Sequence, residues 1–588
     1  MLMLVHGRPR PRRSVWRGWT GRPSPPRGLQ TEGPAAAPFR KSLKDAARRR
    51  QHDADADAPP TTGAAAGGRD KWELTVGIEV HAELNTARKL FSRAATCAGD
   101  TPNRHVALCD AAFPGSQPRL QAETLVPALR AALALNCTVQ ARSSFDRKHY
   151  FYADQPAGYQ ITQYYEPLAR HGHVTLHAHD FPPGTAPPDC PMAIGIKQVQ
   201  LEQDTAKTLR HPPSAHLLDF NRVSHPLVEI ITLPHIHHPT VAAVCVRKIQ
   251  AILRSVGACT AGMDVGGLRA DVNVSVRHRP AESPDGTHAY HGLTGLGQRT
   301  EIKNLASLKA VQDAIIAERD RQIALLESGG AVEGETRGWT LGSKTTKRLR
   351  GKEGEVDYRY MPDPDIAPVL LDSHLISHLH RSLPILPDTM IETLTLQYGL
   401  TVKDAATLVS IDDGHRLDYF LDVLSHLQQH LPQTDLASLG KTTGNWVLME
   451  LGSLFKHVDF DHARVAAADL ASMITHLHHK TITSRSAKNI LAMKFDGDRR
   501  PVRQIIEDDH LELKPLSEAE YVHLAQKLLT ERPNMVKDIV EKKHDKKIMW
   551  FVGQMMATSA EGSVEPAVAE RVLREQLEVQ EATWKKDI

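Results

Sequence analysis

Hydrophobic and polar residues alternate strictly between Thr75 and Leu84, and this pattern predicts a β-strand with two different faces. The apolar face is expected to meet a hydrophobic core and carries Val76, Ile78, Val80, Ala82 and Leu84. The polar face carries Glu79, His81 and Glu83, whose carboxylates and imidazole are spaced to share one divalent cation. The alternative is a solvated face of an antiparallel sheet, because half-buried strands ordinarily carry polar residues outward.

Later segments repeat this kind of polar face. Over residues 196–204 it carries Gln198, Gln200, Glu202 and Asp204, and over residues 268–277 it carries Arg269, Asp271, Asn273, Ser275 and Arg277. Glu229 lies inside the apolar run 226–232. An isolated buried charge costs several kcal/mol, so Glu229 is expected to be paired, protonated or bound to a metal. The structural alternative is a salt bridge to an arginine such as Arg222.

The periodicity changes along the chain and predicts an α+β fold. Residues 303–316 switch to a helical period, with Asn304 or Ser307 available as N-cap. Beyond Pro387 apolar residues recur at every third and fourth position, and Pro566 opens a last helix. We expect a mainly antiparallel-sheet domain over residues 71–366, an all-helical domain over 367–478 and a small helical tail domain over 479–588.

Composition narrows the class of protein. The 588 residues are 41% hydrophobic and 24% charged, and no apolar run approaches the ~20 residues of a membrane helix. A net charge of +3 gives no global nucleic-acid signal, so RNA contacts would come from local patches such as 542–547. The six cysteines form no C-x-x-C pair, which argues against a disulfide framework and indicates a reducing compartment.

The first seventy residues have a composition of their own. Residues 1–31 contain seven arginines and no acidic residue, which is typical of a mitochondrial transit peptide, and residues 53–68 form a low-complexity linker. We therefore expect residues 1–70 to lie outside the fold and to direct the chain to the mitochondrial matrix. A disordered RNA-binding arm is the alternative.

Several catalytic motifs are missing from the sequence. There is no G-x-x-x-x-G-K-[ST] loop, no G-x-S-x-G elbow and no glycine- and serine-rich amidase stretch. No nucleophilic hydrolysis is therefore expected. Carboxylate-held magnesium and the backbone amides of a turn such as Gly266-Gly267 would be the means of holding phosphates.

Longer motifs carry a close resemblance to the B-subunit family of glutamyl-tRNA(Gln) amidotransferases. The matching segments are 75–85, 145–161, 219–222, 226–230, 300–305, 336–339 and 357–365, and weaker matches follow at 445–446, 487–488 and 551–554. The resemblance implies a cradle-shaped catalytic domain, a helical domain and a tail that touches tRNA. It also implies two partner chains, an amidase subunit and a small third subunit of C or F type.

The resemblance implies the chemistry as well. Family members use ATP and Mg²⁺ to phosphorylate the γ-carboxylate of glutamate misacylated onto tRNA(Gln), and ammonia from the amidase subunit then displaces phosphate. The residues it assigns to magnesium are Glu79, His81, Glu202 and Glu229, with Asp204 as a nearby supporting group. Lys148, Tyr152 and Asp154 would line the ammonia path or the acceptor-end pocket, and Arg269 and Asp271 are expected to contribute to cofactor binding.

Two departures from the family pattern affect the metal expectations. Ser92, Ala94 and Ala112 stand where many bacterial members have zinc-binding cysteines and only Cys109 remains, so no zinc is expected. Gln203 replaces a usual glutamate beside Glu202, which predicts weaker or more hydrated magnesium binding.

Two other functions fit the same sequence. The chain would be a non-catalytic tRNA-binding scaffold if the polar sheet were only a docking surface. It would be a stand-alone ATP-dependent ligase if it brought its own nitrogen donor, and the sequence contains no such chemistry. Loss of metal-dependent activity in Glu79→Ala with tRNA affinity retained would separate catalysis from scaffolding.

Overall fold

The computed structural model describes residues 71–584, apart from residues 98, 212–214, 260–261, 264, 280–287, 291–292, 352–357, 514–515, 543–544 and 560–562. The expected transit peptide and linker at 1–70 lie outside the described residues. Within the described part, every helix is too short or too polar to cross a membrane.

A nine-stranded sheet forms the first part of the chain, in the order β16-β15-β14-β11-β1-β10-β7-β6-β2. The pairing of β14 with β15 is parallel, and the other neighbouring strands pair antiparallel. Its strands are β1 (Trp72–Glu83), β2 (Thr138–Val139), β6 (Ala169–Leu176), β7 (Met192–Gln203), β10 (Pro226–Thr232), β11 (Leu268–His278), β14 (Thr300–Leu305), β15 (Glu335–Gly338) and β16 (Lys347–Gly351). The mainly antiparallel sheet and the helical region that follows it confirm the predicted α+β class.

Smaller sheets accompany the large one. In one of them β4 (Asp146–His149) pairs with both β5 (Tyr159–Thr162) and β17 (Met361–Pro362). The others are the pairs β3 (Arg142–Ser143) with β18 (Val369–Leu370), β8 (Lys207–His211) with β9 (Ala215–Asp219), and β12 (His288–Tyr290) with β13 (Leu293–Leu296). The sheet built on β4 packs against β7 of the large sheet through β5.

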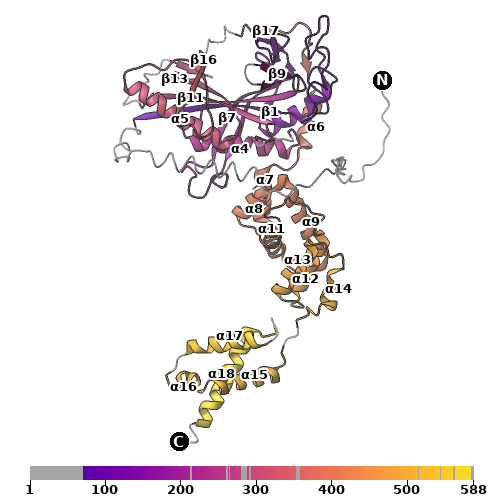
Figure 1. Ribbon diagram of the computed structural model, residues 1–588, viewed down its shortest axis with the longest axis vertical. Helices are drawn as coiled ribbons and strands as arrows, with labels where there is room; N and C mark the ends of the chain where they lie inside the picture. Colours follow the sequence, from indigo (N-terminus) through magenta and orange to yellow (C-terminus); the bar gives the residue numbers. More distant parts are fainter. Residues whose placement is uncertain are drawn as a thin grey trace, which may run out of the picture. The chain divides into compact units, whose positions relative to one another are not determined.

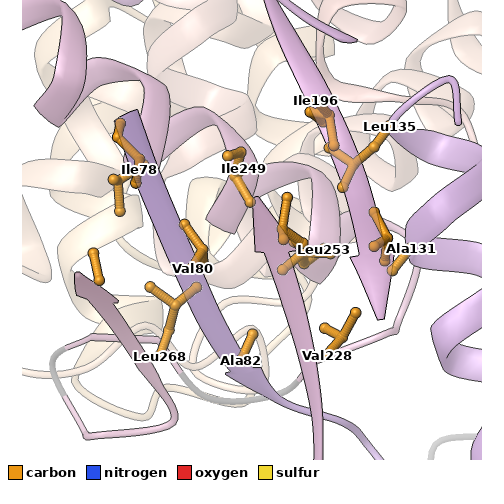
Figure 2. Packing of buried hydrophobic residues seen from close by; sticks show 14 of the residues in the cluster. Ile78, Val80, Ala82, Ala131, Leu135, Ile196, Val228, Ile249, Leu253 and Leu268 are labelled. Carbon is orange, nitrogen blue, oxygen red and sulfur yellow. The ribbon is translucent and has the colours of Figure 1, made fainter. Parts of the chain in front are cut away.

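Helices cover the apolar face of the large sheet and create its core. They are α3 (Leu125–Ala134), which follows the 3-10 turn η1 (Ala122–Thr124), α4 (Pro239–Ser255) and α5 (Leu308–Glu327), and a second 3-10 turn is η2 (Ala178–Asp180). Figure 1 shows α4 and α5 beside the sheet. Figure 2 shows Ile249 and Leu253 of α4 packed among Ile78 and Val80 of β1. All four side chains are buried completely. Burial of each such side chain stabilises the fold by about 1.5–3 kcal/mol.

Helix α5 begins later than the sequence pattern predicts. Lys303 and Asn304 belong to β14, and the helix starts at Leu308 with Ser307 as its N-cap. The Ser307 hydroxyl accepts a hydrogen bond from the backbone N–H of Ala310 at 3.1 Å. Of the two expected N-caps, Ser307 is therefore confirmed and Asn304 is not. Residues 303–305 are strand instead, because a buried strand that runs directly into a helix shows both periods in one apolar segment.

A second core is formed mainly by helices. It includes residues from Met390 to Leu511. The helices after the sheet are α6 (Ser373–Arg381), α7 (Pro387–Leu396), α8 (Val402–Ser410), α9 (His415–His430), α10 (Leu436–Asn445), α11 (Leu451–Leu454), α12 (Ala467–His478), α13 (Ser484–Phe495) and α14 (Val502–Asp508), with a 3-10 turn η3 (Asp412–Gly414) and a π-helical turn η4 (Trp446–Glu450). Of these, α6 contributes Leu379 to the sheet's core.

The tail has a third core of its own. It includes residues from Leu516 to Leu577 and is formed by α15 (Glu518–Glu531), α16 (Pro533–Lys542), α17 (Ile548–Thr558) and α18 (Pro566–Trp584), with the 3-10 turn η5 (Asp545–Lys547). The predicted opening of the last helix by Pro566 is confirmed. The first core ends and the second begins near residues 386–390, and the second ends and the third begins near residues 511–516. The expected domain boundaries are at 366/367 and 478/479.

Candidate functional site

The predicted alternation of β1 is confirmed, and it creates a polar surface on the large sheet. Val76, Ile78, Val80 and Ala82 are fully buried against the helices, whereas Glu79 and His81 point to the other side. Antiparallel register then aligns equivalent faces of neighbouring strands. His81 lies opposite Glu229 of β10, and Glu79 lies opposite Asp271 of β11. The polar residues of four strands therefore meet on one face, across from the core.

His81, Glu202 and Glu229 form a first group of side chains that could hold a metal ion. The His81 Nδ1 atom lies 3.5 Å from Glu202 Oε2, and Glu229 Oε2 accepts a hydrogen bond from the Gln200 amide at 2.7 Å. Glu202 is 1% exposed, yet its Oε2 atom has no hydrogen-bond partner among the described residues. The His81 imidazole is close to this buried oxygen but too distant for an ordinary hydrogen bond, so the oxygen is available as a ligand for a cation.

The expected alternative for Glu229, a salt bridge to Arg222, is wrong. The Arg222 guanidinium instead donates to the backbone carbonyls of Thr205 and Ala206, both at 2.9 Å, and lies 3.5 Å from Asp204. Glu229 faces His81 and Glu202. Register explains this arrangement, because Glu229 sits directly opposite His81 in the ladder.

Burial and mutual repulsion set the charges of the first group. Burial and the nearby Glu202 carboxylate raise the pKa of Glu229. Burial would also raise the pKa of Glu202, but the nearby Lys148 ammonium and His81 outweigh burial and lower this pKa. Burial alone would lower the pKa of His81, whereas the Glu229, Glu202 and Asp271 carboxylates raise it to about 9. At neutral pH the group therefore carries a protonated imidazole among its carboxylates.

Lys148 reaches the first group from β4. Its ammonium lies 3.5 Å from Glu202 Oε1 and 5.0 Å from the centre of the Tyr358 ring. Burial would lower the pKa of Lys148, but Glu202 and other neighbours raise it well above its usual value, so the ammonium stays charged. Tyr164 and Tyr360 stack beside this position at 4.1 Å between ring centres. Lys148 and these aromatic rings therefore lie beside the carboxylates.

Asp154 lies in the loop that follows β4 but does not join the carboxylates. Its backbone carbonyl accepts a hydrogen bond from Ala206 at 2.8 Å, and none of the metal-type groups among the described residues includes it. Burial raises the pKa of Asp154. Tyr152, from the same loop, is 52% exposed and contacts the Tyr150 ring at an interplanar angle of 39°. The loop thus presents aromatic surface to solvent, while Asp154 is anchored at the end of β7.

Glu79, His81 and Asp271 form a second group that shares its imidazole with the first. The Asn273 amide donates to Glu79 Oε1 at 2.9 Å. Asp271 accepts two hydrogen bonds, one from the Lys303 ammonium at 2.9 Å and one from the Asn304 backbone at 2.8 Å. The four residues expected to share one magnesium are therefore divided, with Glu79 on the far side of His81 from Glu202 and Glu229.

Arg269 extends the polar face toward a third acidic residue. Its guanidinium donates to Asp204 Oδ1 at 2.6 Å, and a quarter of the side chain is exposed. The Asp204 carboxylate raises the pKa of Arg269 further. Asp204 thus holds two arginines, Arg269 and Arg222, at one end of the face, where they could meet an anionic ligand.

The Gly266-Gly267 turn does not offer the free amides expected of a phosphate cradle. Gly266 adopts a φ of +85°, which glycine tolerates best. Its N–H donates to the Met263 carbonyl at 3.4 Å, and the Gly267 N–H donates to the Gly262 carbonyl at 3.0 Å. Both amides are used within the turn, whose role is to reverse the chain before β11.

Gln203 points away from Glu202. Its position therefore gives no reason for weaker or more hydrated magnesium binding. Its amide oxygen accepts hydrogen bonds from the Ile161 backbone at 3.1 Å and from Gln155 at 3.4 Å. Its amide nitrogen donates to the Ser224 hydroxyl at 2.7 Å. Successive residues of a strand face opposite sides. Gln203 therefore ties β5 and the turn before β10 together behind the polar face.

The segment after β1 is the one in which no zinc site was expected, and it contains a buried ion pair. The Lys89 ammonium donates to Asp110 Oδ2 at 3.0 Å and to the Phe220 carbonyl at 3.1 Å, and both charged side chains are fully buried. Ser92 donates to the same Asp110 oxygen at 3.2 Å. Cys97 and Cys109 are free thiols outside this pair. These contacts connect the two ends of the loop.

Lys303 lies in the site but is not among the residues predicted from the sequence, although the sequence contains a signal for it. The segment 300–305 alternates, and the alternation places Glu301 and Lys303 on the polar side. The resemblance marked this segment as matching but assigned no role to its lysine. Gln200 was placed on the correct face, and its hydrogen bond to Glu229 could not be foreseen without the register of β7 against β10.

Comparison with known proteins gives a consistent picture over most of the chain. The family model described as the GatB/GatE catalytic domain matches residues 74–377, and the one described as the GatB domain matches residues 433–577. The chain is similar to the mitochondrial B subunit of glutamyl-tRNA(Gln) amidotransferase from Aspergillus fumigatus, at 57% identity over 93% of this chain and 92% of that protein. The proteins of the same name from Neosartorya fischeri and Aspergillus oryzae are 60% and 56% identical, over 86% and 96% of this chain and over 85% and 96% of their own lengths.

Proposed function

The chain belongs to the family of mitochondrial glutamyl-tRNA(Gln) amidotransferase B subunits, and on this basis we propose that the polar face of its large sheet activates the substrate. The enzyme converts Glu-tRNA(Gln) to Gln-tRNA(Gln) by ATP-dependent transamidation. The γ-phosphoryl group of ATP moves to the γ-carboxylate of the tRNA-bound glutamate and ADP leaves. Ammonia then forms the new C–N bond, and phosphate is released.

The observation that carries this proposal is the first carboxylate group. Glu202 and Glu229 supply oxygen atoms, and the Glu202 Oε2 atom, which makes no hydrogen bond to the described residues, is the kind of ligand that Mg²⁺ prefers. The donor set therefore fits the ion that the family implies, with His81 as the third member. A magnesium ion bound there would neutralise negative charge that develops on the transferring phosphoryl group. Asp271, 3.9 Å from His81 Nε2, would orient the imidazole from behind.

Other side chains of this chain would bind the substrates and exclude water. Lys148 keeps its charge beside Glu202 and would attract the γ-phosphate or the glutamate carboxylate to the same place. Arg269 and Arg222, held by Asp204, would bind more distant phosphates of ATP. The tyrosines of 150–165 and 358–360 would exclude water from the activated glutamyl group, which hydrolyses readily.

We further propose that the three hydrophobic cores are three functional parts. The first core supports the catalytic sheet, the second forms a connecting helical domain, and the third carries the tRNA-binding tail. An amidase subunit would supply the ammonia, and a small third subunit would complete the complex. The chain lacks the amidase motifs in its sequence, which agrees with this division of labour.

The test is transamidation by the reconstituted complex with single substitutions in the first group. Glu202→Gln keeps the shape of the side chain but removes its charge, and we expect it to abolish formation of Gln-tRNA(Gln). Glutamine hydrolysis by the amidase subunit, assayed alone, should survive. Glu123→Gln is the matched control, because that carboxylate is half exposed and lies 3.9 Å from Arg88, away from the polar face.

Binding measurements decide between catalysis and scaffolding. Catalysis predicts that Glu202→Gln retains its affinity for tRNA(Gln). A variant that loses tRNA binding together with activity would indicate a docking surface. Unchanged transamidation in Glu202→Gln would remove the first group from the mechanism.

A further inference from the structure

Gln198 and Gln200 lie on the polar face of β7, and the proposed activation chemistry uses neither of them. Both side chains are buried, with exposed fractions of 5% and 3%. Gln200 lies directly opposite Glu229 in the pairing of β7 with β10. Side chains at opposed positions of neighbouring strands come close together, so Gln200 reaches the Glu229 carboxylate across the face of the sheet.

Neighbouring side chains fix the orientation of the Gln200 amide. Its nitrogen donates to Glu229 Oε2 at 2.7 Å and to the Thr162 hydroxyl at 3.2 Å, so both amide hydrogens have acceptors. Its oxygen accepts a hydrogen bond from the Gln198 amide nitrogen at 2.5 Å. Half a turn of the amide would set its oxygen against Glu229 and its nitrogen against the Gln198 nitrogen. Gln198 therefore holds Gln200 with its donor toward Glu229.

The Glu229 carboxylate needs such a partner if it is to serve as a well-oriented metal ligand. The last torsion of a glutamate side chain has broad preferences, so the backbone alone does not fix its oxygen atoms. The hydrogen bond from Gln200 holds one oxygen of the carboxylate beside His81 and Glu202. The amide is uncharged, so it does not repel a cation that binds the same carboxylate. Hydrogen bonds of this kind orient the ligating carboxylates of metal sites.

We propose that Gln200 is a positioning residue that orients Glu229 as a metal ligand, and that Gln198 keeps the Gln200 amide in its donating orientation. This inference rests on the proposed function of the first group as a magnesium site. Both glutamines would act through Glu229 and would touch neither the metal ion nor the substrates. Loss of a hydrogen-bonded partner of a metal ligand typically lowers metal affinity by about 10- to 100-fold.

Titration of the full chain with Mn²⁺, followed by electron paramagnetic resonance, tests the proposal without an activity assay. Mn²⁺ is a spectroscopic substitute for Mg²⁺, and the ion of the first group is identified as the one that Glu202→Gln no longer binds tightly. Gln200→Met keeps the size of the side chain but removes the amide, and we expect the affinity for this ion to fall by about 10- to 100-fold. Gln198→Met should lower it by a smaller factor, because the Gln200 amide remains but is free to turn.

The assembled enzyme gives a second readout, because the metal ligands themselves are all present in Gln200→Met. This variant should need about 10 to 100 times more Mg²⁺ for half-maximal transamidation, in proportion to its weaker metal binding. At saturating Mg²⁺ its kcat should approach that of the wild type, as when only binding is weakened. A purely structural role of Gln200 would lower stability and leave the Mg²⁺ requirement unchanged.

The matched control is Gln203→Met. Gln203 is also a buried glutamine of β7, but its side-chain hydrogen bonds lie behind the polar face. The control should lose stability to urea, as Gln200→Met should, and should still bind Mn²⁺ with wild-type affinity. An equal fall of Mn²⁺ affinity in Gln203→Met would assign the effect to a loosened strand and would overturn the inference.

Two further results separate this inference from the proposed function. Wild-type affinity for the first-group ion in folded Gln200→Met would overturn the inference and leave the metal site in place. If Gln200→Met does not fold, wild-type affinity in Gln198→Met would overturn it instead. Mn²⁺ binding that is unchanged in Glu202→Gln would remove the first group as a metal site, and this inference with it.

Discussion

Two neighbouring residues of β7, Glu202 and Gln203, point to opposite sides of the sheet and have different roles. Glu202 faces the site, and Gln203 makes three hydrogen bonds behind it. Sequence comparison treats the two positions as parts of one acidic motif, because a motif contains no information on side-chain direction. The alternation of the strand does contain that information, and it places Gln203 on the face opposite Glu202.

Gln203→Ala is therefore expected to weaken the fold and to leave metal affinity unchanged. The substitution leaves the buried Ile161 N–H without its partner, at a cost of about 1–3 kcal/mol. Urea unfolding measures the loss, and Mn²⁺ titration measures the affinity. Gln428→Ala, at an exposed position on α9, should change neither. Weaker Mn²⁺ binding in folded Gln203→Ala would return this residue to the metal site.

The charge of His81 predicts how metal binding depends on pH. Its pKa is raised to about 9 by the surrounding carboxylates, so the metal-free protein holds a proton there at pH 7. A metal ligand must be neutral, so binding releases this proton. Affinity for Mn²⁺ should rise roughly tenfold per pH unit for each proton released and level off above about pH 9. The raised pKa of Glu229 acts in the same direction. Titrations between about pH 6 and pH 9 that give a constant affinity would contradict the assignment of His81.

At the scale of elements, the strands of the catalytic sheet were predictable and their junctions were not. Alternation identified β1, β7 and β11 and the polar residues on each. The sequence alone could not give the register that sets His81 opposite Glu229, or the β-bulge between β11 and β14 that turns Lys303 toward Asp271, because both depend on strands distant in the chain. The start of α5 was misplaced for a related reason, since β14 and α5 are joined by only two residues.

A buried ion pair, Lys89 with Asp110, holds the loop between β1 and α3, so its removal should change the stability of the sheet domain. Asp110→Ala leaves the Lys89 ammonium buried without its partner and should destabilise the sheet domain by about 3–5 kcal/mol. The double variant Lys89→Met, Asp110→Leu removes both charges and should recover much of that loss. Thermal unfolding of the full chain measures both.

A control lies in the same loop. Asp100 is about half exposed and pairs with His105, so Asp100→Ala should have little effect on stability. A loss in Asp110→Ala no larger than that in Asp100→Ala would show that the buried pair does not hold the loop.

At the scale of the whole molecule, separate cores allow separate functions. The sequence predicted three parts, and the cores change near residues 386–390 and 511–516. The exact positions could not be predicted because helices of the second and third cores have the same period. The order of folded parts is nevertheless consistent with a catalytic sheet followed by helical tRNA-binding elements.

The basic segment of the tail tests this division. Lys546 is exposed, and Lys547 donates to Asp538 at 2.7 Å, whereas Lys543 and the side chain of Lys542 lie outside the described residues. Replacing these four lysines by Gln should weaken tRNA binding and flatten its salt dependence by roughly one unit of slope for each phosphate that is no longer bound. KM for tRNA should rise with little change in kcat, as when uniform binding is removed.

Exposed lysines of the helical part that surrounds the second core provide the matched control. Lys441 and Lys456 are exposed there, and their replacement by Gln should leave the salt dependence unchanged. Equal slopes for the tail variant and the wild type would assign the basic segment to solvent and place the tRNA contacts elsewhere.

In the proposed mechanism the polar face of the sheet transfers the γ-phosphoryl group of ATP to the glutamate of Glu-tRNA(Gln). The most direct test follows radioactive phosphate from γ-labelled ATP to Glu-tRNA(Gln) in the assembled enzyme without an ammonia source, with α-labelled ATP in parallel. We predict that γ-label reaches the aminoacyl group, that α-label does not, and that Glu202→Gln abolishes the transfer. Transfer of α-label, or undiminished transfer of γ-label by Glu202→Gln, would contradict this mechanism.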